Sequence, residues 1–119
     1  NYLPTRQVLK FGHLRVLHST LVRQHSGMTA RALVERHGVS VLHGHSHRLG
    51  EFYKRDQRGV LGGYEQGCLC DLNPEYENFP NWQQGWATFT VFPNDLFSVE
   101  LVKVVNRSFY VYGGNVVEF

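Results

Sequence analysis

The stretch Val39-Ser40-Val41-Leu42-His43-Gly44-His45-Ser46-His47-Arg48 decides how this 119-residue chain is expected to fold. Its branched, apolar first half predicts a buried strand, which Gly44 ends. Glycine permits tight backbone curvature at that point, and small Ser46 leaves open space beyond it. In an extended chain, His45 and His47 project to the same side and can bind one metal ion or two adjacent ions.

The segment before this stretch predicts a strand and a helix. Leu14–His18 is short and rich in branched residues, as strands are, and Ser26-Gly27 then breaks the chain. Met28–His37 consists of strong helix formers with its apolar residues on one face, and Gly38 follows where a left-handed residue ends a helix. This strand–helix–strand order predicts a parallel βαβ unit.

Histidines follow both predicted strands of this unit. His18 ends the first strand, and His45 and His47 follow the second. Because polar groups gather beyond the C-terminal ends of parallel strands, we expect these three imidazoles at one edge of a sheet. His43 lies within its strand and is expected to be packed or hydrogen-bonded. The remaining histidines are expected to be solvent-exposed or to cap turns: His13, His25 and His37.

Residues 51–119 predict a different, antiparallel β-rich part. The β-rich runs are Glu51–Lys54, Tyr64–Cys70, Trp86–Phe92, Phe97–Val105 and Phe109–Tyr112. Turn signals at Gly62-Gly63, Pro93-Asn94-Asp95 and Asn106-Arg107 separate them, and the last two predict consecutive hairpins. Asp71–Gln84 predicts a long loop, which four aromatic residues are expected to fix by core packing: Tyr76, Phe79, Trp82 and Trp86.

Composition places the chain among globular proteins, and charge divides it in two. Hydrophobic residues make up 42% and charged residues 18%, and no apolar run is long enough to span a membrane. Residues 1–58 hold ten Lys/Arg and three Asp/Glu, whereas residues 59–119 hold two and seven. The basic half contains the histidine cluster. This asymmetry suits an anionic, phosphate-bearing substrate, and it is equally typical of a solvated helix face.

The two cysteines, Cys68 and Cys70, are only two positions apart. A disulfide across that spacing would be strained, so reduced cysteines packed in or near a core are the favoured interpretation. Reduced cysteines fit a cytoplasmic protein. A Cys-x-Cys metal site is the less favoured alternative, because the chain has no second such pair.

Taken together, these motifs resemble the closing part of one enzyme family. A strand ending in His18, then Leu-Val-Arg-Gln-His-Ser-Gly, a helix, and Val-Ser-Val-Leu-His-Gly-His-Ser-His-Arg resemble the closing motifs of calcineurin-like metallophosphoesterases. Gly67-Cys68-Leu69 and Asn81-Trp82-Gln83-Gln84-Gly85 are similar to phage and bacterial members. The resemblance covers most of the chain. It implies an α/β, β-rich fold: the C-terminal half of a two-sheet β-sandwich flanked by helices.

The resemblance also implies a dinuclear active site. His18 and His45 would bind one divalent metal ion and His47 the other, with Mn²⁺, Fe or Zn²⁺ as the metals. Arg48 and Arg23 would contact the phosphate of the substrate. The implied activity is hydrolysis of a phosphomonoester or phosphodiester, in which the metals activate water. A nucleotide, a nucleic-acid end or a phosphoprotein would be the substrate.

The sequence departs from the family in its acidic motifs. The family opens with Asp-x-His, Gly-Asp-x-x-Asp and Gly-Asn-His-Asp/Glu motifs, and none occurs here, since Asp56, Asp71 and Asp95 are the only aspartates. Ser19 also stands where a glycine usually follows the strand-end histidine. Without a bridging carboxylate, we expect this chain alone to be inactive.

We therefore expect a partner that supplies the missing ligands. The chain is interpreted as one domain, residues 1–119, divided into a βαβ part at 1–50 and an antiparallel part at 51–119. Its start at Asn1 favours an N-terminal half carried on an upstream segment or a separate chain. Such a half, or a homodimer, would cover an unpaired sheet edge.

The sequence is also compatible with two other hypotheses. One is a non-catalytic β-rich interaction module that has lost the acidic ligands of the same fold. The other is a structural Zn²⁺ domain that uses His18, His45 and His47 with Cys68 or Cys70. Only the zinc hypothesis requires a thiolate, so substitution of the cysteines distinguishes it from the others.

Overall fold

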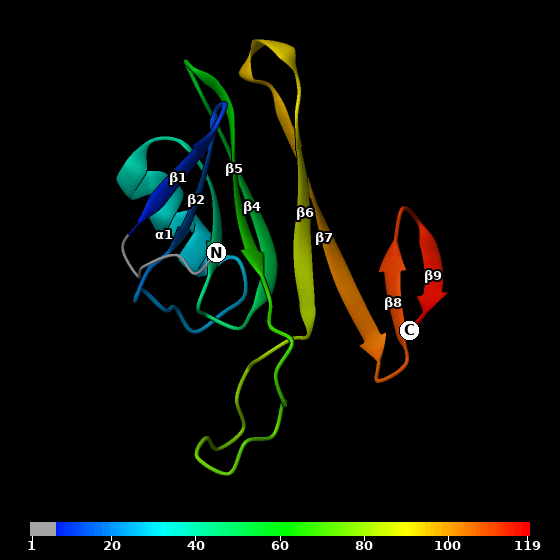
Figure 1. The fold of residues 1–119 in the computed structure, drawn as a ribbon. Helices are drawn as coiled ribbons and strands as arrows, with labels where there is room; N and C mark the ends of the chain where they lie inside the picture. Colours follow the sequence, from blue (N-terminus) through cyan, green and yellow to red (C-terminus); the bar gives the residue numbers. More distant parts are fainter. Residues whose placement is uncertain (1–6) are drawn as a thin grey trace.

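A computed structural model describes residues 7–119, which form two β-sheets and one α-helix (Figure 1). The first sheet has the order β1 (Val8–Phe11), β2 (Leu14–His18), β3 (Ser40–Gly44), β5 (Gly59–Gln66) and β4 (Leu49–Asp56). The second has the order β6 (Gly85–Val91), β7 (Phe97–Asn106), β8 (Phe109–Tyr112) and β9 (Asn115–Glu118). Helix α1 spans Met28–His37, and a short 3₁₀ turn, η1, spans Pro93–Asp95. The protein is thus a compact, β-rich member of the α/β class.

The predicted βαβ unit is confirmed. Strands β2 and β3 pair in parallel from Leu14 opposite Ser40 to His18 opposite Gly44, and α1 connects them. The helix has the predicted bounds, and Gly38 ends it with a φ of 65° while its N–H donates to the carbonyl of Val34. The parallel register therefore places His18 directly beside Gly44, the residue that precedes His45.

The central strands of the first sheet, β2, β3 and β5, are covered on both faces. On one face, Leu17 and Val41 pack against Leu33 and Val34 of α1. On the other face, a second cluster joins the two sheets: Leu14, Leu42 and Tyr64 with Ala87, Phe89, Phe97, Val99 and Leu101. Figure 1 shows α1 and the second sheet on opposite sides of the first sheet. Because both faces are covered, β3 is a continuous buried run without polar–apolar alternation.

Gly62-Gly63 was predicted to be a turn, and this prediction is wrong. Both residues lie inside β5, which runs parallel to β3 with Gly63 opposite Val41. A Cβ atom at Gly63 would lie 2.9 Å from Cγ2 of Val34 and 3.0 Å from the carbonyl oxygen of Ala30. Glycine is present there because the helix packs directly on the strand.

The remaining boundaries also differ in part from the prediction. Strand β5 ends at Gln66, so Cys68 and Cys70 lie after it, outside the strands. Because β4 and β5 both join the first sheet, the change between sheets falls after Gln66, and residue 50 does not mark it. Both hairpins of the second sheet, β6–β7 and β7–β8, are antiparallel as predicted. Two short strands at the ends of the described chain were not predicted: β1 and β9.

The segment 71–84 is irregular, as expected, but most of its aromatic side chains are not in a core. Tyr76 is 79% exposed and Phe79 is fully exposed, so the expectation of core packing is wrong for these two. Trp82 packs on His47, and Trp86 packs on Tyr110 within the second sheet. Tyr76 contacts Trp82 at a centroid distance of 6.3 Å, and surface loops of this kind leave much of their side chains in solvent.

Over residues 7–119, α1 and the other helical segment are too short and too polar to cross a lipid bilayer.

Candidate metal centre

The C-terminal ends of β2 and β3 bring two imidazoles together. The rings of His18 and His45 lie with their centroids 4.8 Å apart and their planes at 73°. His18 is exposed and His45 is half-buried. This pair results directly from the parallel register, because His18 is opposite Gly44 and His45 is the next residue.

The turn Gly44–Arg48, called the histidine turn below, has an unusual backbone. His45 has a φ of 93° and His47 a φ of 57°, both in the left-handed region that side chains other than glycine rarely adopt. Such a conformation costs free energy, so other contacts must hold it. Ser46 lies between the two histidines, is 3% exposed, and donates a hydrogen bond from Oγ to Oε1 of Glu65. That buried hydrogen bond anchors the turn to β5.

Glu65 is a site residue that the sequence analysis missed. It is fully buried in β5, and its second carboxylate oxygen, Oε2, has no hydrogen-bond partner among the described residues. The available signal was a single acidic residue in the otherwise uncharged run Gly59–Gln66. A carboxylate is kept at such a buried position only where its environment compensates the cost of desolvation.

His43 forms a second buried polar group beneath the turn. It is fully buried, as expected, and Nε2 lies 3.1 Å from Oγ of Ser19, which also accepts the N–H of Leu21. Burial, followed by the neighbouring His45 and His18, lowers the pKa of His43 from 6.5 to about 4. Its Nδ1 has no hydrogen-bond partner among residues 7–119. His43 therefore remains a neutral imidazole at physiological pH.

Gln83 fixes the histidine turn from its other side. Its N–H donates to the carbonyl of His47 at 2.9 Å, and its Oε1 accepts from the N–H of Leu49 and from Oγ of Ser26. The adjacent Trp82 lies edge-on to His47, with ring centroids 4.5 Å apart. The segment 81–85 is thus the support of this turn, a role that its sequence alone did not indicate.

The surroundings of His45 favour its neutral imidazole. Burial lowers the pKa of His45, and the nearby His18 and His47 lower it further. A neutral imidazole is the form that binds a metal ion. His45 is therefore suited to bind a divalent metal ion, and the adjacent His18 supplies a second imidazole, a donor type compatible with Mn²⁺, Fe or Zn²⁺.

The two predicted phosphate-binding arginines lie in different places. Arg48 donates weakly to the carbonyl of Ser46, at 3.4 Å, and helps to line a hollow of about 380 Å³. This turn hollow is lined by Val22, His45, Ser46, His47, Arg48, Tyr76, Glu77, Pro80 and Trp82. Arg23 lines a separate hollow on α1, where its neighbours include Arg31 and Glu35. The structure brings Arg48 close to the histidines and does not bring Arg23 there.

The described residues provide only part of a dinuclear site. Within residues 7–119, no third histidine, cysteine or carboxylate places a ligand atom within 4.8 Å of those of both His18 and His45. His47 instead lies near Cys68 and Cys70. The described residues therefore provide one histidine pair at this edge, and they lack the bridging carboxylate that a dinuclear phosphoesterase centre requires.

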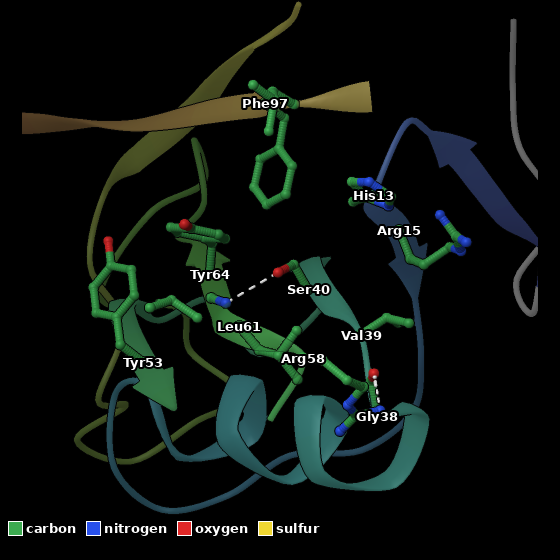
Figure 2. A pocket seen from close by; sticks show the side chains of 13 residues that line it. His13, Arg15, Gly38, Val39, Ser40, Tyr53, Arg58, Leu61, Tyr64 and Phe97 are labelled. Atoms are coloured by element: carbon green, nitrogen blue, oxygen red, sulfur yellow. Dashed lines mark hydrogen bonds between the residues drawn. The ribbon is translucent and has the colours of Figure 1, made fainter. Parts of the chain in front are cut away.

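A larger cavity lies at the opposite ends of the same strands (Figure 2). Its volume is about 660 Å³, and it lies between the β1–β2 turn, the start of β3 and the second sheet. Its arginines already have partners: Arg58 binds Asp56 and the carbonyl of Gly38, and Arg15 binds the carbonyls of Gly12 and Leu14. In sheets of this type, ligands bind beyond the C-terminal ends of parallel strands, which favours the histidine edge as the site.

Comparison with known proteins gives no significant match to a protein-family model, to a curated protein or to a solved structure.

Proposed function

We propose that this protein supplies histidine ligands to a metal-dependent phosphoesterase of the calcineurin-like type. The observation that carries the proposal is the His18–His45 pair, with ring centroids 4.8 Å apart at the C-terminal ends of two parallel strands. His47 is the ligand proposed for a second ion. When bound, two divalent ions supply a Lewis acid for the phosphoryl group and a water of lowered pKa.

The turn hollow supports the choice of a phosphoester substrate. Arg48 provides a permanent positive charge next to His45, and the first half of the chain carries the excess of Lys and Arg. A guanidinium group binds phosphate oxygens in a bidentate manner, which orients the ester. Arg23 lines a separate hollow on α1, so its side chain would have to turn towards the histidines to contact the phosphate. A nucleotide or a nucleic-acid end fits this chemistry, and so does a phosphoprotein.

The proposal also concerns the complete domain to which these two sheets would belong. The two sheets would form half of a two-sheet β-sandwich flanked by helices, and an N-terminal half would supply the bridging carboxylate. That half would come from another segment or another chain, and a homodimer is the alternative arrangement. The chain without these ligands is expected to be inactive.

The test is metal analysis of the full-length gene product combined with hydrolysis of a generic phosphodiester, with and without added Mn²⁺. About two metal ions per complete site and Mn²⁺-dependent hydrolysis are expected. His45→Ala should lower kcat by at least about 100-fold, since removal of one directly acting group typically costs that much or more. His37→Ala, on the exposed end of α1, is the matched control and should keep full activity.

Two results would count against the proposal. The first is a full-length gene product that binds no metal and hydrolyses no phosphoester. The second is hydrolysis that survives His18→Ala and His45→Ala together. Either result would favour a β-rich interaction module in which the histidines only pack.

A further inference from the structure

Three metal-ligating side chains meet where the segment after β5 passes the histidine turn. The ligand atoms of His47, Cys68 and Cys70 all lie within 4.8 Å of one another, and Nδ1 of His47 is 3.7 Å from Sγ of Cys70. Zn–S bonds of about 2.3 Å and Zn–N bonds of about 2.0 Å place the ligands of a tetrahedral site roughly 3.5–3.8 Å apart. The three side chains therefore have approximately the spacing of ligands around one ion.

The backbone holds these residues in place before any ion binds. The N–H of Cys68 donates to the carbonyl of Gln83 at 3.1 Å, and the carbonyl of Cys68 accepts from Gly85 at 2.9 Å. The carbonyl of Cys70 accepts from Nε2 of Gln84 at 2.8 Å. Since Gln83 also binds the carbonyl of His47, one short segment positions all three ligands. A site with this support loses little conformational entropy when it binds a metal ion.

The two cysteine side chains are placed so that they can share one ion with His47. Leu69 is 71% exposed, whereas Cys68 and Cys70 on either side of it are partly buried. The chain bends at Leu69 and Cys70, and this bend leaves the ligand atoms of both cysteines within 4.8 Å of that of His47. A disulfide between them would be strained at this separation, and both cysteines are free. Simple apolar packing would not require a histidine nitrogen beside a sulfur atom.

We propose that His47, Cys68 and Cys70 bind one Zn²⁺ ion, with water in the fourth position. Two thiolates and an imidazole are a soft donor set that favours Zn²⁺ over Mn²⁺ or Mg²⁺. The ion ties the segment 67–85 to the histidine turn and so stabilises the strained backbone of His47.

This site does not depend on the proposed phosphoesterase activity, although the two sites would share His47. When Zn²⁺ takes Nδ1 of His47, only Nε2 of that ring remains for an ion beside His45. Binding converts two thiols to thiolates and releases their protons to solvent.

The experiment is a titration of the reduced, metal-free full-length protein with Co²⁺, a spectroscopic substitute for Zn²⁺. We expect a thiolate-to-cobalt charge-transfer band that saturates at one equivalent and disappears when Zn²⁺ is added. Cys70→Ser should weaken Zn²⁺ binding by more than the roughly 100-fold effect of losing an outer-shell partner. The double variant Cys68→Ser/Cys70→Ser should lack the band. His18→Ala/His45→Ala is the matched control and should keep it.

The charge-transfer band and phosphoester hydrolysis together distinguish the zinc site from the phosphoesterase activity. A charge-transfer band in an inactive protein supports the zinc site and counts against the enzyme. An active protein without the band overturns the zinc site alone. A band that is unchanged in Cys68→Ser/Cys70→Ser, or lost in His18→Ala/His45→Ala, would also overturn it, since the metal would then lie elsewhere. Far-ultraviolet circular dichroism of each variant verifies that it is folded.

Discussion

The two sheets are built under different constraints. In β3 of the first sheet, four of the five residues are buried, because α1 covers one face and the second sheet covers the other. In the strands of the second sheet, Gly85 and Val102 are the buried residues. Each buried position of β3 therefore has to fit its neighbours on one of two covered faces. The second sheet, with one face largely in water, should accept substitution more readily.

The largest effect is expected when a larger side chain is introduced into one strand of each sheet. Gly63→Val in β5 would drive its side chain into Val34 and the carbonyl of Ala30, at 2.9 and 3.0 Å from the first added atom. We expect a loss of at least about 3 kcal/mol in the free energy of unfolding, measured by urea denaturation. Thr90→Val, on the exposed face of β6, is the control and should change it by less than about 0.5 kcal/mol. Equal effects at the two positions would mean that α1 does not pack tightly on β5.

The second test uses pH, because the histidines lie in the first sheet and its connections. The pKa of His43 is 6.5 in its ordinary state and about 4 in the folded protein, so between these values only the unfolded chain binds the proton. The free energy of unfolding should therefore fall as pH drops from about 6.5 to 4, by up to about 3 kcal/mol from this residue, and level off below. His45 acts in the same direction.

Denaturation in EDTA at pH 7 and at pH 4.5 measures this effect. In His43→Gln, the free energy of unfolding should fall much less between pH 7 and pH 4.5 than in the unsubstituted protein. Val102→Ala in β7 should lower stability by the same amount at both pH values, since no histidine lies in the second sheet. A decrease that persists unchanged in His43→Gln would assign it to other groups.

The third and smallest effect concerns a single hydroxyl group. Ser46→Ala removes the hydrogen bond to Glu65 and leaves a buried carboxylate with one contact fewer, which should cost about 2 kcal/mol in unfolding free energy. Ser98→Ala, at an exposed position of β7, should cost less than about 0.5 kcal/mol. If both variants are equally stable, the hydrogen bond to Glu65 does not hold the histidine turn.

The sequence by itself determined the βαβ unit and its histidine edge. Helical periodicity, the glycine at the helix end and the branched strands are local signals, and they gave α1, β2 and β3 within about one residue. The position of His18 beside the histidine turn followed, because parallel strands end at a common edge. The hairpins of the second sheet were predicted for the same reason, from turn residues close in sequence.

Only the tertiary structure decided which distant residues meet. Gly62-Gly63 has the local pattern of a turn, and it is a strand because α1 packs against it. Glu65, Gln83 and the cysteines reach the histidine turn through contacts between segments that are far apart in sequence. Local propensity carries no information about such contacts, since they depend on how sheets and helices pack. The sequence therefore suggested His47 with one cysteine as an alternative, whereas the grouping of His47 with both thiols and apart from His18 and His45 required the tertiary structure.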